Sequence, residues 1–200
     1  MSHFPEPFVL PRTAPAGDGL LLRHWRVGSR EDAETVLRGC LDPEFRRWNT
    51  PVRPLETMED AFDFLVTREE ALERGAAATF CVTDAVSGTA LGQMSLNAVE
   101  PMFRAARVGY WVLPEARGKG VAGRALALAS RWGFTEVGLH RLDLGHGIGH
   151  TVSCRVAERA GYAYEGTLRG AMFGEDSRDT FRDVHLHGRL ATDPEPEART

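Results

Sequence analysis

The stretch of this sequence with the clearest chemical potential is a glycine-rich turn in its second half. It reads Arg117-Gly-Lys-Gly-Val-Ala-Gly123 and follows the strand-like segment 110–113. Glycines lack a Cβ atom, so the backbone can turn tightly and approach a ligand. The first N–H groups of a helix that begins here would point outward with the positive end of its dipole. Such a turn suits a pyrophosphate, and Arg117, Lys119 and Arg124 can add positive charge around it.

A tight strand-to-helix connection without any ligand is the plain alternative for this turn. The pattern GxxxxGK[ST] is absent, so the turn is not a phosphate loop of that type. Gly118, Gly120 and Gly123 do match the spacing GxGxxG. A dinucleotide site also needs a βαβ unit and an acidic ribose ligand about 20 residues later. Asp143, at the end of a strand-like segment, is the nearest candidate and keeps that alternative barely open.

Strands and helices expected before and after this turn must position it. Their order, β-α-α-β-β-β-α-β-α-β-β, predicts one mixed α/β domain. Strands are expected over residues 19–27, 79–99 (two strands with a turn at Ser87-Gly88), 107–113, 139–144, 162–173 and 180–190, and helices over 29–42, 57–74, from 121 onward and over 152–159. We expect the domain to span 19–190, after a proline-rich flexible arm over 1–18 and before a mobile polar tail over 191–200.

Composition excludes several classes of protein. The 200 residues include 42% hydrophobic and 26% charged residues, and no apolar run is long enough to span a membrane. The formal net charge of −4 argues against nonspecific binding to nucleic acid or to an anionic membrane. The cysteines, Cys40, Cys81 and Cys154, show no CxxC pattern, which favours reduced thiols and a cytoplasmic location. Because Lys119 is the only lysine, abundant arginine here indicates codon bias rather than phosphate binding.

Three segments of the chain together resemble a known superfamily. VGYWVLPEARGKGVAGRALALASRWGF, followed by LHRLDL and then SCRVAERAGYAYEGTLRGAMF, is similar to the GNAT-type N-acetyltransferases, and within them to the RimJ/RimL-type group, which resembles ribosomal-protein N-terminal acetyltransferases. The element order is similar over residues 19–190, and the likeness is specific over about 85–175.

The resemblance implies acetyl-CoA as cosubstrate and direct transfer of an acetyl group to a primary amine. It also implies that the strand ending at Leu113 splays from its neighbour, and that Ser153 lies near the sulfur and protonates the leaving thiolate. A helix cap is the structural alternative for Ser153. The residues expected to bind the cosubstrate are Trp111, Val112 and Leu113 through their backbone, Ser153, and the pyrophosphate loop of Arg117, Gly118, Lys119, Gly120, Val121, Ala122 and Gly123.

The chain departs from the family pattern at several catalytic positions. His150 stands where the family often has asparagine, and could bind pantetheine or act as an acid or base. Ala157 replaces a frequent catalytic tyrosine, which leaves Tyr162 or Tyr164 to substitute. Where a carboxylate often precedes the strand, this chain has an arginine. The remaining candidates for the general base are therefore Glu100 and a water relay beside Asn97.

This weak set of bases favours an acceptor amine of low pKa. An α-amine has a pKa of about 7.7–8.0 and a lysine side chain about 10.4. Neutralising them at pH 7 costs on the order of 1 and ~4.6 kcal/mol, respectively. A protein N-terminal α-amine is the first expectation. A small-molecule or antibiotic amine, or a longer acyl-CoA, is the alternative within the fold, and a CoA-binding module without catalysis is the alternative outside enzymes.

We expect no metal site. A zinc site needs three or four converging ligands, whereas His146 and His150 are expected in a loop, and His185 and His187 could share one face of a strand. Cys154 has no histidine and acidic residue in an arrangement that would activate it as a nucleophile.

Homodimerisation is expected only from the resemblance to the family. Aromatic and basic residues that could line an acceptor groove, or could instead be core and solvated loop, are Phe45, Trp48, Phe62, Phe64, Arg46, Arg47 and Arg53.

Overall fold

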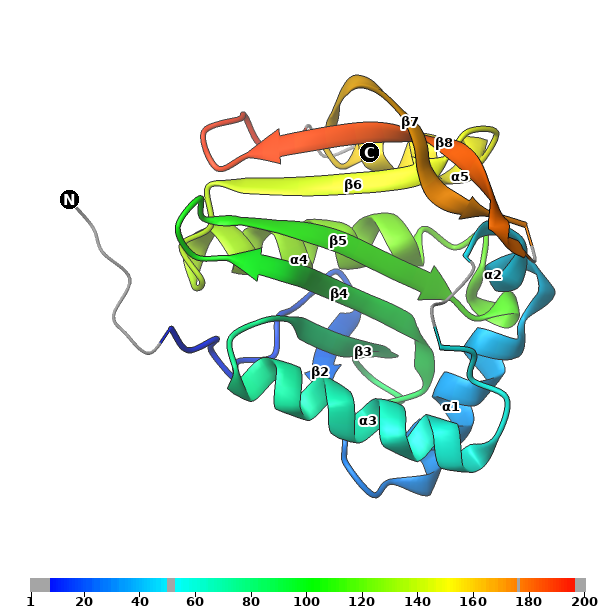
Figure 1. The fold of residues 1–200 in the computed structure, drawn as a ribbon. Helices are drawn as coiled ribbons and strands as arrows, with labels where there is room; N and C mark the ends of the chain where they lie inside the picture. Colours follow the sequence, from blue (N-terminus) through cyan, green and yellow to red (C-terminus); the bar gives the residue numbers. More distant parts are fainter. Residues whose placement is uncertain (1–7, 50–52, 176, 197–200) are drawn as a thin grey trace.

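The computed structural model describes residues 8–49, 53–175 and 177–196, which form one mixed sheet with helices on both faces (Figure 1). The strand order is β1-β2-β3-β4-β5-β6-β8-β7. The strands are β1 Ala16–Gly17, β2 Leu20–His24, β3 Ala78–Asp84, β4 Ala90–Glu100, β5 Ala105–Val112, β6 Arg141–Gly147, β7 Ala163–Gly174 and β8 Ser177–Leu190. The helices are α1 Arg30–Leu41, α2 Pro43–Trp48, α3 Met58–Glu73, the short 3-10 helix η1 Pro114–Ala116, α4 Val121–Thr135 and α5 Thr151–Arg159.

The predicted mixed α/β architecture is confirmed, and two local differences have clear causes. Helix α2 lies between the helices expected over 29–42 and 57–74, where no element is expected. It forms because Asp42 accepts a hydrogen bond from Phe45 N and Pro43 occupies the first turn. The expected arm over 1–18 differs too. Leu10 is buried, and Trp132 Nε1 donates to Thr13 Oγ1 over 2.7 Å. Residues 1–7 lie outside the described part of the chain.

The first part of the expected tail, residues 191–196, is likewise held against the domain. Leu190 N donates to the carboxylate of Asp193 over 2.8 Å, and Arg189 pairs with Glu195 over 3.1 Å. Residues 191–196 are therefore placed by main-chain and ionic contacts. Residues 197–200 of that expected tail are outside the described residues.

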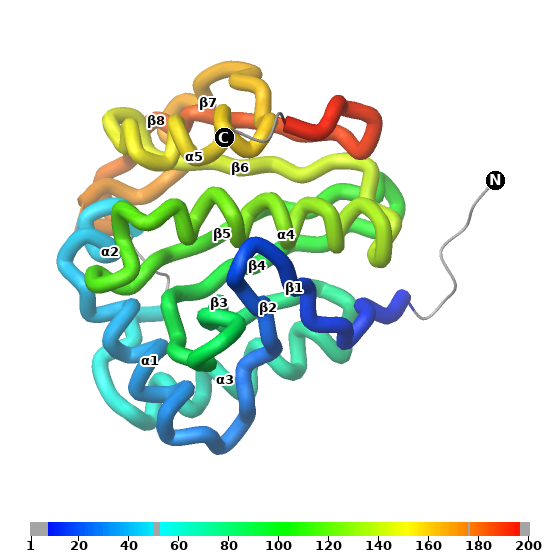
Figure 2. Tube along the Cα trace, turned by 180° about the vertical axis from the view of Figure 1, so that it is seen from behind, coloured from blue at the N-terminus to red at the C-terminus, as the bar shows by residue number. Residues whose placement is uncertain are grey.

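Two hydrophobic clusters hold the helices onto the sheet. Helices α4 and α5 cover one face, as the view from behind shows (Figure 2), and bury Leu126 and Trp132 against Phe80 and Met94. Helices α1 and α3 cover the other face. None of the described helices has the length and apolar character needed to cross a membrane. The two faces are therefore both covered, and the remaining openings lie at the ends of strands.

The sheet parts in its middle. Strands β5 and β6 are parallel neighbours, but they pair only where Ala105–Val108 faces Arg141–Leu144. Beyond Leu144, β6 continues to pair with β8 up to Gly147, while β5 continues with β4 up to Val112. The splaying that the family resemblance implies is therefore present, and it opens next to the N-terminal end of α4 (Figure 1).

A buried carboxylate fastens α1 to the edge of the sheet. Asp32 is 1% exposed, and its two oxygens each accept a 2.8 Å hydrogen bond from the guanidinium of Arg23. Arg26 adds its own guanidinium and its main-chain N–H. Burial by itself would raise the pKa of Asp32, but the hydrogen bonds from both arginines lower it to about 2.

We predict that Asp32→Asn lowers the free energy of unfolding at pH 7 by about 3 kcal/mol, because it leaves Arg23 without a charged partner. The carboxylate pKa is lower in the folded chain than its unfolded value near 4, so its contribution is present above pH 4 and is lost as the pH falls towards 2. Urea unfolding at pH 7 and pH 3 measures this. Glu34→Gln, which removes an exposed pair with Arg30, is the control; equal losses in both variants would contradict the prediction.

Candidate functional site

The parting of β5 from β6 exposes a specific set of main-chain groups. Leu113 N donates to Leu91 O across β4, over 2.9 Å. The N–H and C=O groups of successive residues point to alternate sides of a strand. The main-chain groups of Trp111 therefore also point towards β4, where Trp111 pairs with Gln93. Tyr110 and Val112 therefore direct their N–H and C=O groups into the split. Of the three residues predicted to bind through their backbone, only Val112 faces the opening.

Trp111 and Leu113 contribute in a different way, through buried side chains. Both lie in the cluster beneath α1 and α3, with 7% and 1% of their surfaces exposed. The indole of Trp111 packs so closely on α1 that a Cβ added at Gly39 would lie 2.5 Å from its ring. These contacts hold the end of β5 rigidly while its free edge faces the split.

The glycine-rich turn follows directly, and it has room above it. Gly118 and Gly120 have φ of +73° and +71°, a left-handed conformation that glycine adopts without strain. A Cβ added at Gly118, Gly120 or Gly123 would meet no atom within 4 Å. Gly120 is the N-cap of α4 and offers no side-chain acceptor. The first N–H groups of α4 therefore keep their capacity to bind an anion, as the sequence predicts.

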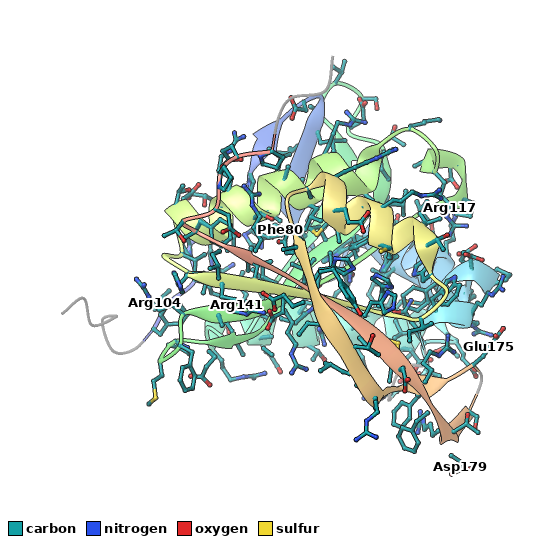
Figure 3. The ribbon with its side chains drawn as sticks, turned by 90° about the horizontal axis from the view of Figure 1, so that it is seen from above. Phe80, Arg104, Arg117, Arg141, Glu175 and Asp179 are labelled. Atoms are coloured by element: carbon teal, nitrogen blue, oxygen red, sulfur yellow. The ribbon has the colours of Figure 1, made fainter. Side chains whose placement is uncertain are left out.

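The three predicted cations surround this turn, each tethered to a neighbour. Arg117 pairs with Asp42 and donates from Nε to Val112 O over 3.0 Å. Lys119 Nζ donates to Glu115 O over 2.9 Å, and Arg124 donates to the main chain of Asp18. Figure 3 shows Arg117 at the N-terminal end of α4. These contacts hold the three cationic side chains around the N-terminus of α4, while residues 118–120 stay exposed.

Ser153 meets an unexpected partner, Tyr110. Its Oγ lies 2.8 Å from the Tyr110 hydroxyl, across the gap between α5 and β5. Ser153 is buried in the first turn of α5, whose N-cap is His150, so the capping role is wrong. Burial raises the pKa of Tyr110, although its bond to Ser153 opposes this. The phenol therefore carries its proton at neutral pH and can donate it.

Tyr110 is not among the site residues predicted from the sequence, and the two tyrosines suggested there do not take its place. Tyr162 is fully buried and bonds Ser130 over 2.8 Å, and Tyr164 bonds Thr167 over 2.9 Å. Neither contacts Ser153. The alternation of side chains along the strand is a signal that indicates Tyr110, because its side chain lies on the same face as those of Ala106 and Val108, which are buried beneath α4 and α5.

His150 lies beside the split and is held by an aromatic stack. Its ring packs on Trp48 of α2 with centroids 4.4 Å apart and planes 8° apart. Burial lowers the pKa of His150 to about 4, so the ring is neutral at pH 7. The guanidinium of Arg182 lies over the same indole, 5.7 Å from its centroid, and Arg182 also donates to Arg47 O over 3.1 Å. Trp48 thus joins α2, α5 and β8 around one rim of the opening.

The two remaining base candidates lie away from the Tyr110–Ser153 pair. Glu100 is exposed and accepts from Met102 N in the β4–β5 turn. It pairs with Ala105, five residues from Tyr110 on β5 or about 17 Å along the strand. Arg104, in the same turn, lies at the opposite end of the molecule from Arg117 (Figure 3). This corrects the expectation for Glu100.

Asn97 is on the wrong face of the sheet for contact with Tyr110. It pairs with Arg107, so its side chain projects to the side opposite Val108 and Tyr110. Its amide donates to Ser95 Oγ over 2.8 Å, and that hydroxyl donates to Gly109 O over 2.9 Å. Asn97 therefore supports the backbone of β5 near the split. Among the other aromatic candidates, Phe45, Phe62 and Phe64 pack in the cluster beneath α1 and α3.

Comparison with known proteins places the fold. The model of the acetyltransferase (GNAT) domain matches residues 20–163. The chain belongs to the GNAT acetyltransferase family. The ribosomal-protein-serine acetyltransferase of Escherichia coli is 31% identical over 100 residues, 50% of this chain and 54% of that protein. YdaF of Bacillus subtilis is 31% identical over 86 residues, 43% of this chain and 47% of that protein. The chain thus spans about half the length of these curated relatives.

Solved structures extend the likeness over nearly the whole chain. RimJ of Mycobacterium smegmatis, in complex with CoA-disulfide, has a TM-score of 0.76 and 25% identity over 89% of this chain and 84% of that one. The microcin C7 self-immunity acetyltransferase MccE has a TM-score of 0.77 at 17% identity, over 92% and 99% of the two chains, which shows a shared fold. This GNAT chain therefore has the RimJ/RimL-like architecture predicted from its sequence.

We predict that Trp48→Ala raises the pKa of His150 from about 4 towards its ordinary value, because removing the indole opens the imidazole to water. An NMR titration of the histidine ring protons measures the change. His24 packs on Phe80, away from Trp48, and its titration should stay unchanged as an internal control. A His150 pKa that stays near 4 in the variant would show that another contact keeps the ring neutral.

Proposed function

We propose that this chain is an acetyl-CoA-dependent N-acetyltransferase that transfers the acetyl group directly to a primary amine. The observation that carries the proposal is the placement of the Tyr110–Ser153 pair at the split between β5 and β6, beside the glycine-rich N-terminus of α4. The end of β5 supplies a strand edge free of β6, the start of α4 supplies an anion site, and Tyr110 with Ser153 supplies a part-buried pair of hydroxyls. Thioester aminolysis needs this combination.

The residues present fit acetyl-CoA. The space above Gly118 and Gly120 leaves the first N–H groups of α4 to hold a diphosphate, with Arg117 and Lys119 beside it. The main-chain groups of Tyr110 and the N–H of Val112 face the split and suit the amides of a pantetheine arm, as added pairing to a strand edge. The carbonyl of Val112 already accepts a hydrogen bond from Arg117 Nε. Acetyl-CoA would supply an activated thioester carbonyl to this site.

The hydroxyl pair would handle the proton of the departing thiolate. Tyr110 stays protonated because it is buried, and its hydroxyl lies 2.8 Å from Ser153 Oγ. One hydroxyl gives its proton to the thiolate and the other hydroxyl replaces it; the proton that the acceptor nitrogen loses on forming the amide then restores the pair. Ser153 is held in the first turn of α5, where the positive end of the helix dipole favours the negative charge that develops nearby.

The acceptor is proposed to be an amine of low pKa, such as the α-amine of a protein N-terminus. Glu100 is remote, and His150, with a pKa of about 4, is too weak a base to deprotonate a lysine side chain effectively. An α-amine needs less help, since its pKa is about 7.7–8.0. The name of the E. coli relative, a ribosomal-protein-serine acetyltransferase, supports a protein acceptor.

A thiol-release assay with purified chain and acetyl-CoA tests this function. The acceptors are peptides with a free N-terminus, the same peptides with a blocked N-terminus and an internal lysine, and a panel of small amines. We expect release with the free α-amine alone. Release only with small amines would replace the protein acceptor, and CoA binding without release on any acceptor would overturn the enzymatic proposal.

We predict that Ser153→Ala lowers the transfer rate about a hundredfold, within the range for loss of a proton donor, while the affinity for CoA changes little. Tyr110→Phe removes the partner hydroxyl and should lower the same rate constant. Tyr164→Phe, which loses only an exposed bond to Thr167, is the matched control. Steady-state rates with calorimetric CoA titration separate the two effects; an unchanged rate in Ser153→Ala would remove this hydroxyl from the mechanism.

The glycine-rich turn, here called the glycine cradle for its residues Gly118, Gly120 and Gly123, leads to a second prediction. Gly120→Ala and Gly88→Ala place a methyl group at equally left-handed positions, φ +71° and +72°, with nothing within 4 Å of either Cβ. Both should lower the free energy of unfolding by about 1 kcal/mol. Only Gly120→Ala should weaken CoA binding, by about tenfold, because its methyl group lies at the helix N-terminus. Calorimetry and thermal denaturation measure both quantities; equal CoA affinities would argue against this cradle.

A further inference from the structure

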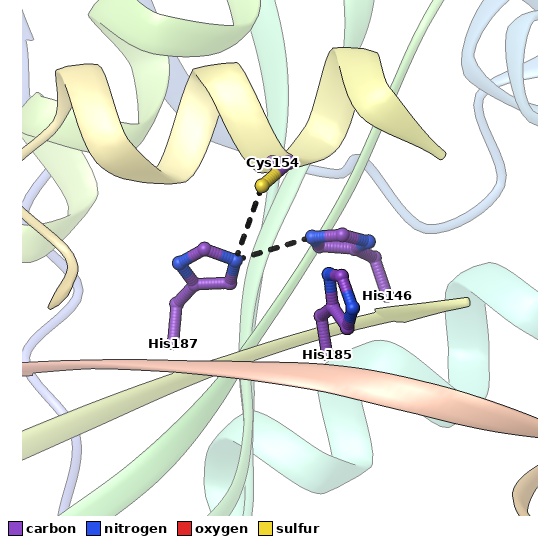
Figure 4. Close-up of side chains that lie close together, drawn as sticks. All are labelled: His146, Cys154, His185 and His187. Carbon is purple, nitrogen blue, oxygen red and sulfur yellow. Dashed lines mark hydrogen bonds between the residues drawn. The ribbon is translucent and has the colours of Figure 1, made fainter. Parts of the chain in front are cut away.

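Four potential metal ligands meet on the face of the sheet that α4 and α5 cover, next to the split. They are His146 from β6, Cys154 from α5, and His185 and His187 from β8 (Figure 4). One ligand atom from each lies within 4.8 Å of the other three. We propose that these side chains bind a divalent zinc ion in a tetrahedral three-histidine, one-cysteine site.

The register of the sheet explains why three imidazoles converge. His146 on β6 is paired directly with His185 on β8. His187 is two residues along β8, so it projects from the same face as His185. Helix α5 packs over this face, and its Cys154 side chain points towards the three histidines (Figure 4). His185 and His187 share one face of β8, as the sequence suggests. His146 lies on β6 rather than in the expected loop, and His150 is not part of the cluster, because it stacks on Trp48.

Two separations in the structure already match the edges of a zinc tetrahedron. Zinc binds imidazole nitrogen at about 2.0–2.1 Å and thiolate sulfur at about 2.3 Å, so tetrahedral angles place two nitrogens ~3.3 Å apart and a nitrogen and sulfur ~3.6 Å apart. His146 Nε2 and His187 Nε2 are 3.3 Å apart, and Cys154 Sγ is 3.7 Å from His187 Nε2. A ligand nitrogen of His185 lies within 4.8 Å of the other three ligand atoms.

The hydrogen bond at the far side of His146 orients it as a ligand. Its Nδ1 lies 3.2 Å from Gly147 O. A carbonyl oxygen can only accept, so Nδ1 carries the proton and Nε2 presents its lone pair to the cluster. Metal-binding histidines are commonly oriented in this way, by a bond from the second nitrogen to a carbonyl.

Burial and donor type select the ion. His146 and His187 are 4% and 0% exposed, and Cys154 and His185 are half-buried. Imidazole and thiolate favour zinc over magnesium or calcium, which prefer oxygen ligands. Cys154 Sγ points its proton towards Glu158 Oε1, 3.5 Å away, and that carboxylate can accept the proton when the thiolate binds metal.

An occupied site would tie α5 to β6 and β8, one residue after Ser153. Its function is therefore to hold the first turn of α5, and with it the Ser153 hydroxyl, against the split. This goes beyond acetyl transfer and does not depend on it, because metal binding is measured without any acyl donor.

The test begins with the full chain stripped of metal by a chelator and titrated with Zn²⁺. We expect one bound zinc per chain by elemental analysis and a raised thermal midpoint, since binding only to the folded chain stabilises it. Co²⁺ in place of zinc should give the intense absorption of a tetrahedral site together with a thiolate-to-metal band. A chain that binds no stoichiometric zinc, or an octahedral cobalt spectrum without the thiolate band, would overturn the proposal.

Matched variants assign the ligands. Cys154→Ser should abolish the thiolate-to-cobalt band, and His187→Gln should weaken zinc binding about a hundredfold or more. The controls are Cys40→Ala and His140→Gln, a cysteine and a histidine outside the cluster, which should bind as the parent does. Circular dichroism verifies that each variant folds. If His187→Gln does not fold, the cobalt spectrum of Cys154→Ser decides, and a band that survives there contradicts the site.

Discussion

The loss of pairing between β5 and β6 after Val108 and Leu144 is the constraint on which the rest of this structure depends. Had the two strands stayed paired, the main-chain groups of Tyr110 and Val112 would be consumed within the sheet. The separation is maintained from both sides. Trp111 anchors β5 to α1, and β8 binds β6 along its full length. The opening is therefore built by packing and pairing elsewhere, not by a flexible loop.

Both proposed sites depend on α5, which crosses the end of this opening. One side of its first turn presents Ser153 to Tyr110, and the next residue, Cys154, faces the imidazoles of β6 and β8. A nine-residue helix has little stability by itself, so tertiary contacts must fix its position. The buried residue Ala157 supplies one such contact, which also explains why a small side chain stands there.

Much of the fold could be predicted from local signals in the sequence. The helices expected from residues 29 and 57 do begin there, because Ser29 and Thr57 cap α1 and α3, and the glycines before Val121 mark the start of α4. The glycine cradle was predictable because its chemistry lies within one continuous segment. Helix α2 was not, because prolines around it favoured a loop interpretation over the capping signal of Asp42.

The pairings at the site could not be predicted, because they depend on register between distant strands. Tyr110 and Ser153 are 43 residues apart, and His146 and His187 are 41 apart. Nothing in either segment alone indicates its partner. Glu100 illustrates the opposite error, since a carboxylate near the correct strand lies at its far end. Residue type suggested candidates, but only three-dimensional placement could select among them.

The short parallel seam between β5 and β6 has a mechanical consequence. Within the described chain, main-chain pairing joins the β6–β8–β7 block to the other strands only along Ala105–Val108 and Arg141–Leu144. Every other pairing of that block is internal to it. A small rotation about this seam would change the separation between the diverging ends of β5 and β6 without disturbing any antiparallel ladder.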